Sequence, residues 1–356
     1  MPTMEELVRE AVGKGSSDLH LSAGGPPRVR VDGDLVATDH PSLDAAGVQA
    51  LVDSIMTSEQ RERFHVDHEL DFSWAVGDIG RFRVNVFMQG RGPGAVLRTI
   101  PTVIPSFESL QLPPFLAELC KRDRGLVLVT GPTGSGKSTT LAAMVDMVNE
   151  TWDAHILTIE DPVEFVHQSK RCLVNQREVG AHTASFSAAL RSALREDPDV
   201  ILVGEMRDLE TISLALTAAE TGHLVFGTLH TSSAPKTVDR IIDVFPAGQQ
   251  SQIRTMLAES LEAVIAQRLM KKVGGGRIAA CEILTGTTAV RNLIREGKLH
   301  QIPSMMQTGQ SQGMVTFDMA IADLQKRGLV AKEAPPPRPA TNVNVHMAPP
   351  AAAANG

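Results

Sequence analysis

The chain has 356 residues, of which 42% are hydrophobic and 21% are charged. This length exceeds one typical globular domain, and this balance excludes both a largely disordered chain and a membrane-embedded one. The formal net charge of -7 argues against a surface whose main task is to neutralise nucleic-acid phosphates. We therefore expect two packed domains and no nucleic-acid partner.

The cysteines and the N-terminal residues indicate the compartment. Cys120, Cys172 and Cys281 are dispersed and odd in number, so neither a disulfide framework nor a C-x-x-C metal site can be built within one chain. Residues 1–20 alternate apolar and charged side chains and lack the apolar core of a signal peptide. No segment reaches the roughly 20 apolar residues that span a bilayer. The expected location is the cytoplasm, with membrane association only through partner proteins.

Residues 1–100 are predicted to form a small α/β domain. Its expected elements are a helix over 4–12, a hairpin over 28–36 that turns at Asp32-Gly33, a helical stretch over 44–64, and strands over 71–76, 81–87 and 95–100. In the strand over 81–87, the apolar even positions share one face, and Arg81 and Arg83 share the other. Arg98 lies on the next strand.

The remaining chain divides into three parts. Four prolines punctuate residues 101–120, which are expected to be a linker. Residues 121–331 alternate short apolar strands, over 126–130, 156–159, 200–203 and 224–228, with helices, a pattern typical of a mostly parallel sheet covered by helices. A helix-rich region is expected over 248–330, with a turn at 274–276. Residues 332–356 are rich in proline and alanine and are expected to be a disordered tail.

A complete G-x-x-x-x-G-K-[ST] motif lies between the strand over 126–130 and a predicted helix over 138–148. Its glycines let backbone N–H groups and the helix N-terminus point at a β-phosphate. Lys137 then supplies positive charge to the β- and γ-phosphates, and the Ser138 hydroxyl is expected to ligate Mg²⁺. The alternative is a chance glycine-rich turn. The predicted ATP-binding residues are Gly131, Pro132, Thr133, Gly134, Ser135, Gly136, Lys137, Ser138 and Thr139.

Carboxylates end two of the predicted strands. Glu205 follows the strand over 200–203, at the sheet edge beside the phosphate loop, where it is expected to hold Mg²⁺ or polarise a nucleophile. The cluster over 160–164 follows the strand over 156–159, and either Glu160 or Glu164 could orient the attacking water. The alternatives are a helix cap at Glu205 and a capped turn around Pro162.

Four segments in order, GPTGSGKST, TIEDPVEFVH, ILVGEMRD and TGHLVFGTLHT, resemble the Walker A, Asp box, Walker B and His box of the secretion and pilus ATPase superfamily. AVRNLIRE, over 289–296, makes the chain similar to the retraction ATPases of type IV pili. The resemblance begins at SDLHLS, over 17–22, and ends after about Val330. It implies an α/β fold, in which a smaller PAS-like domain precedes a RecA-like P-loop ATPase domain.

The resemblance also implies roles for residues beyond the phosphate loop. It makes Glu164 the general base, Glu205 the Walker B glutamate, and His223 and His230 the His-box histidines. His230 follows the strand over 224–228 at its carboxyl end, which favours a role as γ-phosphate sensor. His223 could instead be only a buried hydrogen-bonding group.

Three N-terminal arginines are implied to complete the site when the two domains close. Arg81, Arg83 and Arg98 carry planar guanidinium groups, which clamp phosphate oxygens and offset developing negative charge. The alternative is a solvated strand face. The sequence leaves open which of the three contacts phosphate.

The block tied to retraction in similar proteins comprises Ala289, Val290, Arg291, Asn292, Leu293, Ile294, Arg295 and Glu296. Its apolar residues are expected on one stripe of an amphipathic helix, with Arg291, Arg295 and Glu296 elsewhere. Val290 replaces the usual isoleucine and conserves its β-branched shape. The chain lacks the four-cysteine zinc element that extension and secretion relatives commonly carry, which favours retraction over extension.

The resemblance implies a homo-hexameric ring at the inner-membrane base of the pilus. Its implied partners are a membrane platform protein and an accessory retraction ATPase, and its ligands are ATP and Mg²⁺. Four alternatives stay open: an accessory retraction paralogue, an extension or type II secretion ATPase, a scaffold that binds ATP without turnover, and a DNA motor. The last is disfavoured by the acidic charge and by an aromatic content of 4% without tyrosine.

Overall fold

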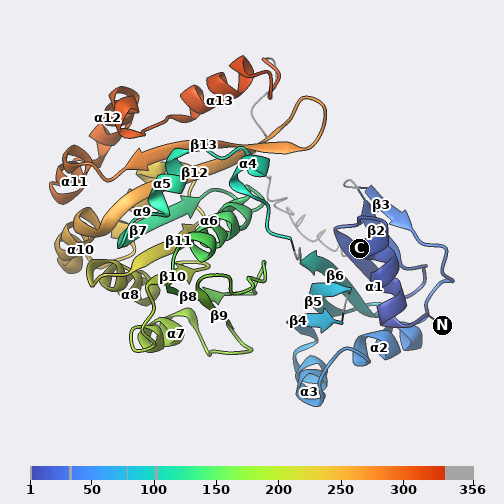
Figure 1. Cartoon of the computed structure of the whole chain (residues 1–356). Coiled ribbons are helices and arrows are strands. Elements are labelled where there is room, and N and C mark those ends of the chain that lie inside the picture. Colours follow the sequence, from blue (N-terminus) through green and yellow to red (C-terminus); the bar gives the residue numbers. More distant parts are fainter. Residues whose placement is uncertain (1, 32–33, 78, 101–102, 333–356) are drawn as a thin grey trace, which may run out of the picture.

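The computed structural model describes residues 2–31, 34–77, 79–100 and 103–332 and contains two sheets (Figure 1). The smaller, six-stranded sheet has the order β3-β2-β1-β6-β5-β4, and its neighbouring strands pair antiparallel. Its strands are β1 (Asp18–Ser22), β2 (Arg28–Val31), β3 (Asp34–Ala37), β4 (Glu69–Val76), β5 (Gly80–Gln89) and β6 (Gly92–Ile100). Helices α1 (Met4–Gly13), α2 (Ala45–Asp53) and α3 (Ser58–Asp67) accompany it.

One face of this sheet forms a core. Phe82, Val84 and Val86 of β5 are buried and share an apolar cluster with residues of α1 and α2, as the alternation in β5 predicts. Arg81 and Arg83 therefore lie on the opposite face, away from this core. This arrangement leaves the arginine face available to the rest of the molecule.

The predicted helix over 44–64 is wrong as a single element, because the chain forms α2 and α3 there. The Thr57 hydroxyl accepts a hydrogen bond from the Gln60 amide, and the Gln60 side chain accepts one from the Thr57 amide. This capping box starts a new helix at Ser58. The predicted turn at Asp32-Gly33 and most of the predicted tail, residues 333–356, lie outside the described residues.

The larger, seven-stranded sheet has the order β13-β12-β7-β11-β10-β8-β9. All neighbours pair parallel except β12 and β13. Its strands are β7 (Gly125–Thr130), β8 (His155–Glu160), β9 (Leu173–Glu178), β10 (Val200–Val203), β11 (Leu224–Leu229), β12 (Leu261–Lys271) and β13 (Arg277–Thr285). The mostly parallel sheet expected from the sequence is thus present.

Helices cover both faces of this sheet (Figure 1). Val127 and Val129 of β7 point to one cluster, and Leu126 and Leu128 point to the other. The first face carries α4 (Phe107–Leu110), α5 (Phe115–Leu119) and α6 (Lys137–Thr151), and the second carries α7 (Phe186–Ala193), α8 (Leu209–Glu220), α9 (Ala234–Asp243), α10 (Ala247–Ser260) and α11 (Thr288–Arg295). Helices α12 (Ile302–Thr308) and α13 (Phe317–Lys326) follow. Within the described residues, none of these helices has the length and apolar character of a bilayer span.

The prediction that residues 248–330 are essentially helical is wrong over β12 and β13. These strands form a hairpin through Gly274, Gly275 and Gly276, whose φ angles of 85°, 105° and 77° suit a tight turn of glycines. The β12 sequence is rich in residues that favour helices, but β12 pairs with β7 and lies in the buried sheet. Tertiary pairing therefore overrides local propensity.

Two further features refine the predicted organisation. Strand β9 has a polar sequence and was not anticipated as a strand, but it pairs parallel with β8 at the sheet edge. Helices α4 and α5 lie within the predicted linker, and their apolar side chains join the core beneath α6. The division into domains at 101–120 stays a prediction.

Candidate functional site

The predicted phosphate loop connects β7 to α6. All six residues of β7 are buried, which fixes the point where the loop begins. Gly131, Gly134 and Gly136 have φ angles of 145°, 77° and 89°, a region that favours glycine. A Cβ on Gly131 would lie 2.5 Å from the Gln267 carbonyl oxygen, so a larger residue would not fit.

The loop fits an anionic ligand. Helix α6 begins at Lys137 without a side-chain cap, so the backbone N–H groups of its first turn are available to donate hydrogen bonds to a phosphate. Lys137 Nζ donates to the carbonyl oxygens of Gly131 at 3.0 Å and Pro132 at 3.3 Å. Burial lowers the pKa of Lys137, although the charges of Glu205 and Glu164 oppose that shift. The chemistry of this cradle matches a nucleotide phosphate.

Glu205 and His230 lie side by side because β10 and β11 pair in parallel. Glu205 follows β10, His230 follows β11, and the His230 Nε2 atom is 3.1 Å from Glu205 Oε1. Arg207 Nε lies 2.6 Å from the same oxygen. Burial raises the pKa of Glu205, but hydrogen bonds and charge from Arg207 and His230 outweigh it and lower the pKa overall. Glu205 is therefore held as a carboxylate.

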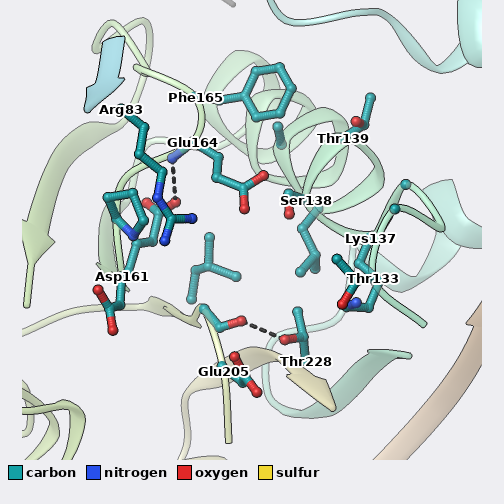
Figure 2. A pocket seen from close by; sticks show the side chains of 18 of the residues that line it. Arg83, Thr133, Lys137, Ser138, Thr139, Asp161, Glu164, Phe165, Glu205 and Thr228 are labelled. Carbon is teal, nitrogen blue, oxygen red and sulfur yellow. Dashed lines mark hydrogen bonds between the residues drawn. The ribbon is translucent and has the colours of Figure 1, made fainter. Parts of the chain in front are cut away.

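The two carboxylates left open in the segment over 160–164 differ in their surroundings. Glu160 accepts hydrogen bonds from Thr158 Oγ1 at 2.6 Å and Gln176 Nε2 at 3.2 Å, and burial raises its pKa. Glu164 is exposed and points into the space between the phosphate loop and the smaller sheet (Figure 2). Its position suits contact with a ligand, whereas Glu160 is occupied by internal hydrogen bonds.

The smaller sheet contributes two of the predicted arginines to the same cavity. Arg83 of β5 and Arg98 of β6 are cross-strand partners, and both line a cavity of about 430 Å³ that Lys137, Glu164 and Glu205 also line. Figure 2 shows the Arg83 side chain extending toward that space. Arg98 Nε is 2.8 Å from the Asp18 carboxylate, which orients it.

Two of the predicted catalytic residues are not brought to this cavity. Arg81 hydrogen-bonds to Glu178 and Ser73 and does not line it. His223 precedes β11 at the amino end, so the whole strand separates it from His230. Its Nδ1 atom is 2.9 Å from the Ala218 carbonyl oxygen. His223 is thus half-buried and hydrogen-bonded to a nearby backbone carbonyl, and its role stays a prediction.

Sequence reasoning missed several residues around the site. Arg277 begins β13 and lines the cavity, but it lay in a region expected to be helical. His167 also lines the cavity, and it is 7% exposed. Burial lowers its pKa to about 4, so it is neutral. Its Nδ1 has no partner among the described residues. The glycine run between two strand-length segments could have indicated the hairpin that carries Arg277.

A second cavity of about 300 Å³ adjoins the first and shares Gly136, Thr139, Leu269 and Arg277 with it. Its remaining lining comes from α4 and the residues after it, from α6 and from the β12–β13 hairpin, and it mixes apolar and polar side chains: Ser109, Leu110, Gln111, Leu112, Thr140, Lys272, Ile278 and Ala279. Such a pocket beside a phosphate loop suits a planar base.

A family model described as type II/IV secretion system protein matches residues 1–311. The chain belongs to this family. It is 60% identical over 328 residues to the type IV pilus retraction ATPase PilT of Pseudomonas aeruginosa, covering 92% of this chain and 95% of that protein. It is 59% identical over 309 residues to a twitching motility protein of Neisseria gonorrhoeae, covering 86% of this chain and 83% of that protein.

A solved structure agrees with these relatives. The crystal structure of the pilus retraction motor PilT with bound ADP matches with a TM-score of 0.88 and 51% identity, covering 94% of this chain and 96% of that one. These findings confirm the resemblance to the retraction ATPases and the predicted α/β fold of a P-loop ATPase.

Proposed function

We propose that this member of the family hydrolyses ATP in the cavity between the two sheets and uses the reaction to retract type IV pili. The expected ATPase class and retraction function are confirmed by the relatives, one of which is named a retraction ATPase and matches 92% of the chain. The observation that carries the proposal is the composition of one cavity. It unites the phosphate loop with carboxylates, histidines and arginines from separate parts of the sequence, among them Glu164, Glu205, His230, Arg83 and Arg98.

Each side chain has a role that follows from its position. The amides around Gly136 and the Lys137 ammonium bind the β- and γ-phosphates. Glu164 accepts the proton of the attacking water, because its carboxylate faces the cavity. His230, whose Nε2 atom lies 3.1 Å from Glu205 Oε1, senses the γ-phosphate in this proposal. Arg83 and Arg98 offset the charge that develops as that phosphate leaves.

Mg²⁺ fits the same site. The Ser138 hydroxyl at the start of α6 and the Glu205 carboxylate both line the cavity and are oxygen donors of the kind that Mg²⁺ prefers. When bound, the ion would neutralise part of the negative charge of the phosphates. The adenine base is proposed to occupy the adjoining cavity, with the apolar side chains of Leu269 and Ile278 among its walls.

The division of the site between two sheets supports a motor mechanism. A ligand changes a conformational equilibrium only through different affinities for its two states. A triphosphate that touches Lys137 and Arg83 together is bound more tightly when the sheets approach, so binding favours closure and hydrolysis releases it. We propose that six copies form a ring at the inner-membrane pilus base and act on a platform protein there. An accessory retraction ATPase is a further proposed partner.

The retraction motif is proposed to mediate this coupling through its exposed residues. Val290 and Ile294 are fully buried in the core, as the predicted stripe requires. Asn292, Arg295 and Glu296 are exposed and remain available to a partner.

Phosphate release by the purified protein with Mg²⁺ tests the proposal against a scaffold that does not hydrolyse ATP. Wild-type protein is expected to turn over ATP, and Glu205→Gln is expected to lose about 10²-fold or more in kcat because Mg²⁺ and nucleophile lose an ionised ligand. Arg295→Ala is expected to keep turnover but to abolish twitching in a strain deleted for the gene. Wild-type rates in Glu205→Gln, or normal twitching in Arg295→Ala, would contradict the respective assignment.

A further inference from the structure

A polar cluster outside the nucleotide cavity joins the two sheets. Arg81 Nη2 on β5 donates to Glu178 Oε2 at 2.8 Å and to Ser73 Oγ on β4 at 2.9 Å. The Ser73 hydroxyl donates to Glu178 Oε1 at 2.7 Å. Glu178 ends β9 of the larger sheet, and Figure 1 shows β4 and β5 facing β9. Both carboxylate oxygens of one residue are therefore occupied by the smaller sheet.

Glu178 also holds the segment that carries the proposed general base. The Val163 amide donates to Glu178 Oε2 at 3.1 Å, and Val163 directly precedes Glu164. The Glu178 side chain is only 5% exposed, and that of Arg81 is 24% exposed. A buried carboxylate depends on its partners, because loss of one donor leaves charge without compensation. A single side chain thus connects the smaller sheet to the segment of Glu164.

The cluster also fixes the register of the arginine face. Arg81 and Arg83 lie on the same face of β5, two residues apart, or about 7 Å along the strand. Ser73 is the cross-strand partner of Arg83 on β4, and Arg98 is its partner on β6. Attaching Arg81 and Ser73 to Glu178 therefore holds Arg83 and Arg98 at the position where they line the cavity.

We propose that Ser73, Arg81 and Glu178 form a latch between the sheets that positions Arg83 and Glu164 for hydrolysis. Arg81 is then a positioning residue that acts through Arg83, and it does not itself bind phosphate. The proposal rests on ATP hydrolysis in the adjoining cavity. It assigns Glu178, which no sequence motif singled out, to the coupling of hydrolysis with the approach of the two sheets.

Steady-state ATP turnover and ADP affinity test the latch in the full-length protein. Arg81→Gln and Glu178→Gln are each expected to lower kcat about tenfold, because either change misplaces Arg83. The affinity for ADP is expected to change less than about threefold, because the phosphate loop stays intact. Ser73→Ala, which removes one hydrogen bond and keeps the ion pair, is a milder variant with an expected loss of about twofold to threefold.

The adjacent residue on β9 provides a matched control. Arg177 Nη1 is 2.8 Å from Glu196 Oε1, and among the described residues neither side chain forms a hydrogen bond or ion pair with the smaller sheet. Arg177→Gln and Glu196→Gln break an ion pair of the same length between β9 and the segment after α7, and both are expected to leave turnover unchanged. Thermal unfolding of every variant checks that the fold is retained, and Ser73→Ala keeps the test decisive if a latch variant unfolds.

A double variant distinguishes positioning from direct phosphate binding. If Arg81 acts through Arg83, Arg81→Gln combined with Arg83→Gln should be no slower than Arg83→Gln alone. The latch would be overturned if the losses of kcat from Arg81→Gln and Arg83→Gln multiplied in the double variant. Weakened ADP binding in Arg81→Gln would also overturn it, as would wild-type kcat in both Arg81→Gln and Glu178→Gln. Failure of the proposed function can be distinguished from failure of the latch, because the wild-type protein itself would then show no ATP turnover.

Discussion

The two halves of the nucleotide cavity are held in place by different means. The phosphate-loop half stands on β7, whose residues are all buried, and Lys137 hydrogen-bonds within its own loop. The arginine half lies on β5 and β6, where the side chains of Arg83 and Arg98 are 45% and 66% exposed. Their access to the cavity depends on contacts between sheets. Phosphate binding is therefore a local property of the larger sheet, whereas arginine contact can change with the arrangement of the sheets.

Removal of the phosphate-loop cation should have the largest effect. Lys137→Ala is expected to lower ATP turnover by about 10³-fold or more, because no other cation lies within the loop to replace its charge on the phosphates. Phosphate release measures the effect, and Lys326→Ala, at an exposed position near the end of α13, is the matched control. Turnover within tenfold of wild type in Lys137→Ala would break the assignment of this half.

Variants of the arginine half should have smaller effects that depend on closure. Arg83→Gln is expected to lower kcat by about 10²-fold with a smaller change in ADP affinity, because its guanidinium contributes mainly as charge develops. Arg98→Gln is expected to lose less, since the buried Asp18 carboxylate already compensates part of the Arg98 charge. Equal losses of ADP affinity in Arg83→Gln and Lys137→Ala would remove the difference between the two halves.

The retraction motif on α11 also contains residues held by different means: some are hydrogen-bonded to neighbouring elements, and others are exposed. Arg291 donates to the carbonyl oxygens of Ala258 and Glu259 at the end of α10, and its Nη2 is 2.7 Å from Glu262 Oε1. The sequence predicted that Arg291 lies off the buried apolar stripe of the retraction motif. In the structure its side chain joins α11 to the end of α10. Arg291→Ala is expected to destabilise the protein by about 2 kcal/mol through the lost hydrogen bonds and ion pair.

Denaturant unfolding of Arg291→Ala and Arg295→Ala checks this distinction. Arg295 is exposed and bonds only to Asn292 of its own helix among the described residues, so its change should stay within about 0.5 kcal/mol. Equal stability of the two variants would show that Arg291 does not join α10 to α11 in solution.

Much of the site was predictable because its signals are local. The glycine spacing and Lys137 follow from the geometry that a phosphate requires, and both stand next to a predicted strand and helix. Glu205 and His230 were predicted at the carboxyl edge because parallel strands end there together, and the structure brings them within 3.1 Å. Arg83 was predicted only as one of three arginines. No local signal separated it from Arg81, because both lie on the same face of one strand.

The failed prediction in the C-terminal region depends on distant contacts. Residues of β12 favour helix by composition, and only their place beside β7 makes them a strand. The helical stretch predicted over 44–64 is instead divided by a local signal, the capping box at Thr57. Arg277 was missed together with its hairpin.

By itself the sequence determined which chemistry the protein carries: a loop for phosphates, carboxylates at strand ends and a stripe of apolar residues in the retraction motif. These are short-range patterns, which fix backbone geometry within a few residues. The tertiary structure alone decided which arginines meet the phosphate loop. Arg81 finds Glu178 across 97 residues, and Arg83 reaches the cavity because that contact sets the position of its strand. Residues so far apart in the sequence become partners only because the two whole sheets pack in a particular arrangement.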